Sequence, residues 1–272
     1  MKDVQSYYDS LAEKEYDRLG PSRALHYQLE FERTIDTLVQ HLPENGHILD
    51  AGGGAGRYTE WLAEQGYTVT LVDLSPQQVR HAQDILSDYD SVNICNGTID
   101  QLPIQNNVFD AIVCTGGPLS HLIDKQDRVN AVTEFKRVGK SNSYLFISVM
   151  SLINALQNLV SNVPEFDQTA MLPEFIEDGV YSHERAQQNS IVNETEEFTE
   201  CKFYRANEFR NFLTSQDLKV HEILGLESIA YGSDKNMTDK QEKSVRDTIT
   251  ELGNDDTIAE ISAHMLATCQ IQ

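Results

Sequence analysis

The sequence predicts an α/β fold with a mostly parallel sheet and helices on both faces, and residues 47–75 carry the observations behind this prediction. An apolar run ends in a set of glycines, Gly52 to Gly54. A helical pattern follows over residues 57–65 and stops at Gly66, as a glycine C-cap does. A β-rich run then ends at Asp73. A strand, a crossover helix and a parallel strand form one right-handed βαβ unit.

The glycine loop and the acid that follows it predict an adenosine-containing cofactor. Without Cβ atoms, the backbone of Gly52 to Gly56 can approach a ligand closely and direct N–H groups at it. The following helix adds its positive N-terminal end. Asp73 ends the second strand at the same edge of the sheet, where a carboxylate accepts hydrogen bonds from a ribose diol. The alternative is a tight strand-to-helix turn that binds nothing.

The third glycine of the loop distinguishes between cofactors. A dinucleotide loop reads G-x-G-x-x-G and requires glycine at position 57, where this chain has arginine. The chain instead reads D-x-G-x-G-x-G from Asp50 to Gly56. This pattern resembles motif I of the class I S-adenosylmethionine (SAM) methyltransferases, in which the position of Asp73 belongs to the ribose-binding acid. The resemblance implies SAM as cofactor, S-adenosylhomocysteine as product, and cofactor contacts at Asp50, Gly52, Gly53, Gly54, Gly56, Asp73 and Leu74.

Two later stretches extend the implied cofactor site. Residues 97–103 resemble the family's G-D-A-x-x-L-P-F segment, but Thr98 stands where the acid that contacts the adenine amino group is usual. Asp100 is the expected substitute, and the Ile99 amide is expected at the ring. The loop that begins with Thr115 and Gly116 follows strand four, beside the switch point of the sheet, and is expected near the SAM methyl group and the substrate.

The N-terminal segment carries a further part of the resemblance. Tyr8, Asp9, Ala12, Tyr16 and Asp17 are similar to a segment that closes over the cofactor in small-molecule SAM methyltransferases. The resemblance implies that Tyr8, or its neighbour at position 7, hydrogen-bonds the methionine part of SAM. The alternative is an amphipathic helix whose tyrosines only pack.

The resemblance covers residues 6–150 and is nearest to the ubiquinone/menaquinone-type branch of small-molecule enzymes. It implies a Rossmann-like, seven-stranded sheet with the strand order 3-2-1-4-5-7-6. We expect four parts along the chain, with the second helix starting at Arg23. They are an N-terminal helical cap (1–42), a SAM-binding core (43–150), a lid insertion (151–202), and a C-terminal part of the core (203–272) with a helical excursion at 225–261. The alternative for the insertion is a surface decoration, and the excursion is either a solvated face or a partner-docking element.

Candidates for chemistry are few. Methyl transfer is an in-line displacement, so a general base matters only when the nucleophile carries a proton. His121, in the loop after strand four, is the best-placed base, and the alternative is a histidine that orders its loop. Tyr204 and Arg205 lie where the lid returns, and an arginine there could hold an anionic group. His183 and His264 are weaker candidates. We expect no metal site, because no His, Cys, Asp and Glu set has ligand spacing.

Composition limits the partners. The 272 residues include 43 Asp and Glu but 21 Lys and Arg, a net charge of −22, which disfavours binding to nucleic acid. Adaptation to high salt is the alternative reason for this acidity. The four cysteines share no close spacing, and no apolar run is long enough to span a bilayer. We therefore expect a cytoplasmic protein, monomeric or homodimeric.

These features favour a methyltransferase that acts on an O, N or C atom of a small molecule. The absence of the Asp/Asn-Pro-Pro-Tyr and Pro-Cys motifs after strand four weakens modification of nucleic-acid bases. The alternatives are a tRNA or rRNA methyltransferase and a non-catalytic SAM-binding subunit of a complex.

Overall fold

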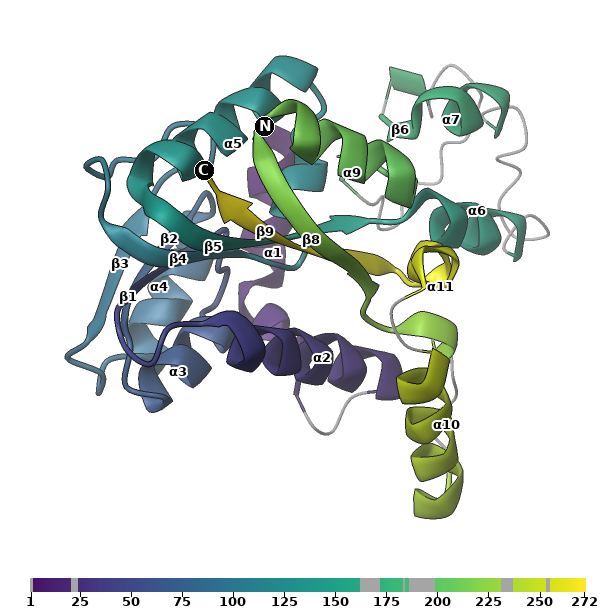
Figure 1. The fold of residues 1–272 in the computed structure, drawn as a ribbon, viewed down its shortest axis with the longest axis horizontal. Coiled ribbons are helices and arrows are strands. Elements are labelled where there is room, and N and C mark those ends of the chain that lie inside the picture. The colour runs from purple at the N-terminus through teal and green to yellow at the C-terminus, as the bar shows by residue number, and fades with distance from the viewer. Residues whose placement is uncertain are drawn as a thin grey trace.

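The computed structural model describes residues 2–20, 24–161, 172–182, 184–185, 199–230, 237–252 and 255–272. A seven-stranded sheet runs through the centre in the order β3-β2-β1-β4-β5-β9-β8 (Figure 1). Its strands are β1 (His47–Ala51), β2 (Thr68–Asp73), β3 (Val92–Asn96), β4 (Phe109–Cys114), β5 (Gly139–Met150), β8 (Leu218–Gly225) and β9 (His264–Ile271). The first five pair in parallel, and β9 pairs antiparallel with β5 and β8. Counted along this sheet, the order is 3-2-1-4-5-7-6, so the predicted topology is confirmed.

The sequence did not predict a second, smaller sheet. Strands β6 (Val180–Tyr181) and β7 (Cys201–Lys202) pair with each other inside the insertion after β5. Their two-residue lengths gave no alternating pattern to recognise.

Helices cover both faces of the sheet. Helices α5 (Lys125–Val138) and α9 (Ala206–Ser215) lie on one face, and α2 (Leu25–His41) and α3 (Arg57–Glu64) on the other. The remaining described helices are α1 (Lys2–Arg18), α4 (Pro76–Ile85), α6 (Leu152–Ser161), α7 (Leu172–Asp178), α10 (Asp239–Leu252), α11 (Asp256–Ile261) and the 3-10 turns η1 (Pro118–His121) and η3 (Ser228–Ala230). None of these described helices combines the length and apolar composition that a bilayer crossing requires.

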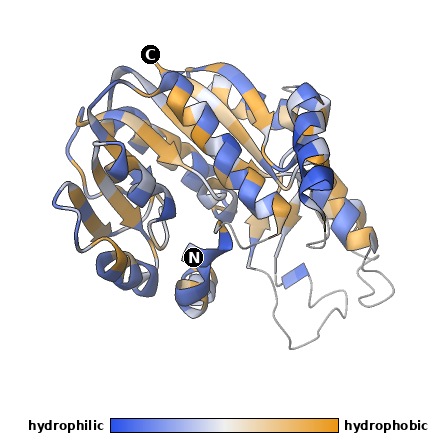
Figure 2. Cartoon of the chain, turned by 90° about the horizontal axis from the view of Figure 1, so that it is seen from below, coloured by the Kyte–Doolittle hydropathy of each residue, from blue (hydrophilic) through white to orange (hydrophobic). Residues whose placement is uncertain are grey.

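Each central strand contributes to two apolar layers, because neighbouring side chains point to opposite faces. On β1, Leu49 packs with Phe135 of α5, while the preceding Ile48 packs with Leu38 of α2 and Leu62 of α3. All five side chains are fully buried. Figure 2 shows these apolar strands enclosed between more polar helices. The central strands therefore read as continuous apolar runs and not as alternating ones.

Helix α1 crosses the edge where the parallel strands end, and polar contacts fix it there. The Asp9 carboxylate accepts hydrogen bonds from Ser75 Oγ at 2.5 Å and from the Gln77 backbone N–H at 3.1 Å, at the start of α4. Arg18, in the last turn of α1, pairs with Glu30 of α2 at 2.6 Å. The first helix of the expected N-terminal cap begins at Lys2. The second helix begins at Leu25, and Arg23 lies outside the described residues.

The insertion after β5 is described only in part. Residues 162–171, 183 and 186–198 lie outside the described residues, and so does the candidate His183. In the described part, the rings of Phe175 and Phe203 meet edge to face at 5.4 Å. The excursion between β8 and β9 contains α10, which projects from the sheet in Figure 1. Its Ile249 is buried against Leu25 and Leu29 of α2.

Two glycines around α3 give a matched test of the local backbone. Gly56 (φ +90°) and Gly66 (φ +92°) both lie in the left-handed region, where a side chain costs about 1 kcal/mol or more. A Cβ at Gly66 would meet nothing within 4 Å, whereas one at Gly56 would lie 2.7 Å from Leu86 Cδ1. We expect Gly66→Ala to lower the free energy of unfolding by about 1 kcal/mol and Gly56→Ala to lower it by clearly more. Urea titrations followed by circular dichroism measure both, and equal losses would contradict the packing role of Gly56.

Candidate functional site

A pocket opens where β1 to β4 end, and α1 forms its opposite wall. Its position is that of ligands in doubly wound sheets. Of the sequence-predicted residues, those that line it are Tyr8, Gly52, Gly53, Gly54, Asp73, Leu74, Thr98, Ile99, Asp100, Thr115, Gly116 and His121. The four segments that follow the four strands, distant in sequence, therefore meet in one cavity.

The glycine loop has a backbone that only glycine adopts without strain. Gly52 (φ +76°) donates its N–H to the Val72 carbonyl at 2.7 Å, which joins the ends of β1 and β2. A Cβ at Gly52 would lie 2.5 Å from Cγ of Pro118, in the loop after β4. The close approach of these two loops therefore requires glycine at this position.

Asp73 forms a bridge between two loops of the pocket. Its Oδ2 accepts the Gly54 N–H at 2.9 Å and its Oδ1 accepts the Ser75 N–H at 2.8 Å. Burial raises the pKa of this carboxyl to about 6, although both N–H groups oppose the increase. Each oxygen keeps a lone pair beyond its backbone partner, so the ionised group retains the capacity to accept two hydroxyl donors.

Asp50 and Gly56 belong to the same motif but do not line the pocket. The Asp50 carboxyl is buried under Gly53 and accepts a hydrogen bond from Thr59 Oγ1 at 2.6 Å. Its pKa rises to about 7 because burial penalises the charge, a shift that the hydrogen bond from Thr59 opposes. Gly56 instead caps α3. These two residues support the loop from below.

Among the described residues, four buried side-chain oxygens on the pocket wall lack hydrogen-bond partners, which allows the fit of the implied cofactor to be tested. They are Asp100 Oδ1, Thr115 Oγ1, Gln78 Oε1 and the Tyr58 hydroxyl. SAM carries an adenine amino group and a methionine ammonium group, which need acceptors of this kind. A carboxylate for the ribose, unpaired acceptors for the amino groups and a close glycine backbone fit SAM. Asp100, where the family pattern has its acid two positions earlier, has an oxygen available for the adenine.

Tyr8 and His121 contact each other inside the pocket. The Tyr8 hydroxyl lies 2.8 Å from His121 Nε2, and His121 Nδ1 lies 3.2 Å from the Glu200 carbonyl oxygen. Because a carbonyl only accepts, we assign the ring proton to Nδ1, so Nε2 accepts from Tyr8. Burial lowers the pKa of His121 to about 4 and raises that of Tyr8. The imidazole is therefore neutral at physiological pH.

Tyr204 and Arg205, predicted as catalytic candidates, lie away from this pocket. Tyr204 is 2% exposed and packs its ring on Phe209 in the core. Arg205 caps α9 and pairs at the surface with Glu260 at 2.8 Å. The sequence placed both at the return of the insertion, but a core position and a helix start explain them better.

The sequence analysis missed a row of side chains from α1. Glu15 and Arg18 line the pocket together with Tyr8, at spacings of seven and three residues that place them on one helical face. Arg18 donates to Glu15 at 2.6 Å and to Glu30 of α2. This spacing was visible in the sequence, but the burial of Glu30 and its pairing with Arg18 were not.

The titration of Asp73 gives a test of the ribose contact. The pKa is raised, so the carboxyl gains its proton as the pH falls through about 6 and then loses acceptor capacity for hydroxyl donors. We expect SAM affinity to be constant from pH 8 to 7 and to weaken about tenfold per pH unit below 6. Asp73→Asn, which keeps the shape without the charge, should bind more weakly and without this pH dependence. Calorimetry measures both proteins, and a wild-type affinity that is equal at pH 8 and pH 5 would rule out the contact.

Comparisons with known proteins agree with this geometry. A family model described as "Methyltransferase domain" matches residues 48–142. The chain is 30% identical over 203 residues to the demethylmenaquinone methyltransferase of Lactiplantibacillus plantarum, covering 72% of this chain and 80% of that protein. It is 26% identical over 148 residues to the glycine/sarcosine N-methyltransferase of Parasynechococcus marenigrum, covering 53% and 50%.

A solved structure shows the same fold along nearly the whole chain. It is a methyltransferase from Haloferax volcanii in complex with the Trm112 methyltransferase activator, with a TM-score of 0.60, 16% identity and 97% coverage of each chain. The chain spans about half the length of several curated relatives that it matches. The coverage and identity to the demethylmenaquinone enzyme nevertheless establish the family. The chain belongs to the class I SAM-dependent methyltransferases, and SAM is its cofactor.

Proposed function

We propose that this protein transfers the methyl group of SAM to a hydroxyl oxygen of a small molecule. The observation that carries the proposal is the contact between Tyr8 and His121 inside the cofactor pocket. A neutral imidazole in the loop after β4 supports it, because this loop is expected near the SAM methyl group and the substrate. The relatives with which the chain aligns, a glycine/sarcosine N-methyltransferase and a demethylmenaquinone methyltransferase, support a small molecule as the acceptor.

The bond changes need one proton acceptor. The acceptor oxygen attacks the methyl carbon in line with the sulfur, so a C–O bond forms while the C–S bond breaks. The electron pair of that bond stays on sulfur and gives S-adenosylhomocysteine. The hydroxyl proton passes to His121 Nε2. Without the acceptor, the lone pair of Nε2 accepts a hydrogen bond from Tyr8, and it becomes available when the acceptor hydroxyl replaces the Tyr8 hydroxyl there. The pocket otherwise aligns the reactants and excludes water.

The low pKa of His121 favours a hydroxyl over an ammonium group. An amine is protonated at neutral pH and must lose a proton before it can attack, which a base with a pKa of about 4 promotes poorly. A hydroxyl keeps its lone pairs, and its proton becomes strongly acidic only as the C–O bond forms. A weak neutral base is therefore suited to the second case.

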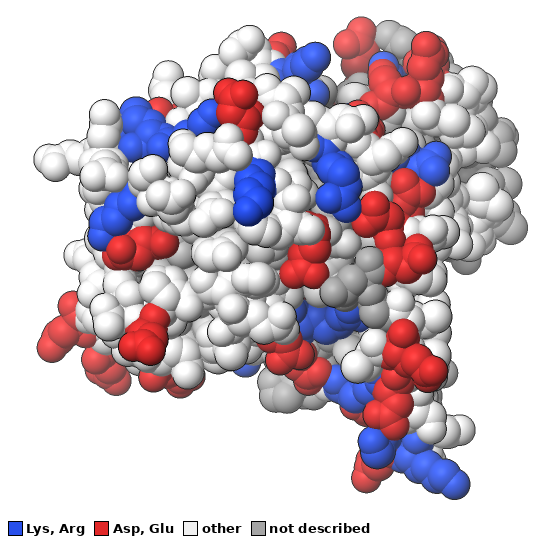
Figure 3. Space-filling view, viewed as in Figure 1, with Lys and Arg blue, Asp and Glu red and all other residues white. Residues whose placement is uncertain are grey.

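A nucleic-acid acceptor has less support. The chain carries a net charge of −22, and on the face in Figure 3 Lys and Arg side chains are interspersed with Asp and Glu. An RNA methyltransferase binds phosphates through a local excess of Lys and Arg. A non-catalytic subunit is the remaining alternative, and a solved neighbour does bind an activator protein.

The experiment is a release assay for S-adenosylhomocysteine with the purified full chain. One arm receives SAM with a filtered small-molecule extract, and the other receives SAM with total tRNA and rRNA. We expect release in the first arm only, together with a methyl ether that mass spectrometry identifies. Release with RNA alone, a methylated amine as product, or no release in either arm would contradict the proposal.

A pair of substitutions tests the base. We expect His121→Ala to lower kcat by about 10²- to 10⁴-fold, the usual contribution of a general base, while SAM affinity measured by calorimetry stays unchanged. Tyr8→Phe keeps the ring against His121 and removes only the hydroxyl, so kcat should fall far less. If His121→Ala retains full kcat on the acceptor found in the extract, the histidine only orders its loop.

A further inference from the structure

His264 does not line the cofactor pocket, but it lies beside the loop after β4 that does. It begins β9 and pairs with Met150 at the carboxyl end of β5. A Cβ built on Gly117 would lie 4.0 Å from His264 Cδ2, the ring carbon bonded to Nε2. Gly117 is flanked by Gly116 and Pro118, which both line the pocket. The Nε2 edge of the ring therefore faces the loop that follows β4.

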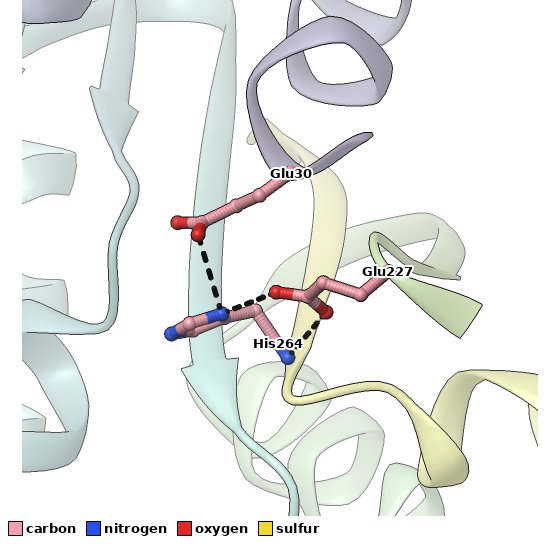
Figure 4. Close-up of side chains that lie close together, drawn as sticks. All are labelled: Glu30, Glu227 and His264. Carbon is pink, nitrogen blue, oxygen red and sulfur yellow. Dashed lines mark hydrogen bonds and ion pairs between the residues drawn. The ribbon is translucent and has the colours of Figure 1, made fainter. Parts of the chain in front are cut away.

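Two buried glutamates hold the opposite edge of the ring (Figure 4). His264 Nδ1 lies 2.6 Å from Glu227 Oε1 and 3.8 Å from Glu30 Oε2. The backbone N–H of His264 donates to the second oxygen of Glu227 at 2.9 Å. Both glutamate side chains are 1% exposed, whereas the histidine side chain is 14% exposed. The carboxylates thus fix the orientation of the imidazole, as in other carboxylate–histidine pairs.

The second ring nitrogen, Nε2, is directed away from the two glutamates (Figure 4). Among the described residues none hydrogen-bonds His264 Nε2, and Figure 4 shows it directed away from both carboxylates. Burial lowers the pKa of His264, but Glu30 and Glu227 outweigh it, and the net shift is upward. An imidazolium held in this way donates Nδ1–H to Glu227 and has one N–H left to donate.

Other charged and titratable groups surround the ring. Arg18 of α1 donates to both oxygens of Glu30, at 2.6 and 3.1 Å, so that carboxylate is shared between Arg18 and His264. His26 and Arg33 on α2 interact with Glu227, and burial lowers the pKa of each. His121 of η1 interacts electrostatically with His264, and burial keeps its imidazole neutral. Within the described part of the chain, Glu30 and Glu227 are therefore the carboxylates that act on His264.

A cation between the three residues is the competing interpretation. Ligand atoms of Glu30, Glu227 and His264 lie within 4.8 Å of one another. A metal ion there would have to displace the Arg18 guanidinium from Glu30. It would also have to replace the proton on His264 Nδ1 that is donated to Glu227. Both are charge-assisted hydrogen bonds, which are strong in a buried setting. The geometry instead leaves a donor directed outward.

We propose that His264 is an acceptor-binding residue, whose Nε2–H holds an oxyanion of the methyl acceptor, a carboxylate above all, beside His121. This inference rests on the proposed function and narrows its substrate to small molecules that carry both a hydroxyl and an anionic oxygen. Glu227 is the positioning residue, since it acts on the acceptor only through the imidazole.

The test uses benzoate as the probe, on the full chain saturated with S-adenosylhomocysteine, and calorimetry as the measurement. We expect the wild type to bind benzoate at least about tenfold more tightly than benzamide, its neutral analogue. His264→Asn places an amide near the position of Nδ1, so it keeps the bond to Glu227 and should bind benzoate about tenfold more weakly. His264→Gln reaches the position of Nε2 and should lose less. Equal binding of benzoate to wild type and His264→Asn, or none to the wild type, would overturn the proposal.

Two further measurements separate the alternatives. In the wild type, benzoate should bind more weakly as the pH rises through the raised pKa of His264, because the imidazolium is the donor. This readout needs no variant and holds even where a substitution fails to fold. Zinc or magnesium chloride that binds the wild type and competes with benzoate would instead establish a cation site. The release assay tests only the proposed function, and benzoate binding tests only this inference. Failure of the one is therefore distinguishable from failure of the other.

Discussion

The cofactor pocket depends on one carboxylate that joins two loops. Asp73 accepts the N–H of Gly54 after β1 and the N–H of Ser75 at the start of α4. These bonds fix the separation of two strand ends, so the glycine loop keeps an open backbone instead of collapsing onto β2. The cost is a buried charge, visible as a pKa raised to about 6. Such a cost is tolerable where the remaining lone pairs have further donors to accept.

A second constraint couples α1 to the acceptor side. Arg18 lines the pocket, yet its guanidinium forms its bonds to Glu30, and Glu30 lies beside His264. At the other end of the pocket wall, Tyr8 of the same helix contacts His121. One helix therefore contacts both histidines of the proposed acceptor site, one directly and one through Glu30. A displacement of α1 would disturb the cofactor wall and the acceptor contacts together.

Local sequence patterns determined how much of the fold and of the candidate site could be predicted. The first βαβ unit follows from apolar runs, glycines and the βαβ rule, all readable within short windows, whereas the order of the whole sheet was implied by the family resemblance; both predictions are confirmed. The glycine loop, Asp73 and the loop after β4 were expected at one edge because parallel strands bring their ends together there, and the segment after β3 was expected there from the resemblance. Tyr204 and Arg205 were placed by chain position alone, which does not distinguish a core tyrosine or a helix cap from a pocket residue.

The residues that no local pattern revealed are those of the buried charge cluster. Arg18, Glu30, Glu227 and His264 come from four separate elements and meet only in the folded chain. In the sequence, Glu30 reads as a charged position of an amphipathic helix, and Glu227 as a polar residue after a strand. Their burial is a consequence of tertiary packing, which the 3.6-residue and two-residue periods do not encode.

This cluster also allows two positive charges, the SAM sulfonium and the imidazolium proposed for His264, to lie near one proposed acceptor site. SAM brings a sulfonium, and an uncompensated imidazolium nearby would repel it and lose its proton in a buried setting. The glutamates remove that conflict for His264, since they supply negative charge on the edge of the ring away from the pocket. His121 avoids it in the opposite way, because burial without a carboxylate partner keeps its ring neutral. The two histidines thereby undergo opposite pKa shifts, which lower the pKa of His121 to about 4 and raise that of His264, as the proposed roles of proton acceptor and hydrogen-bond donor require.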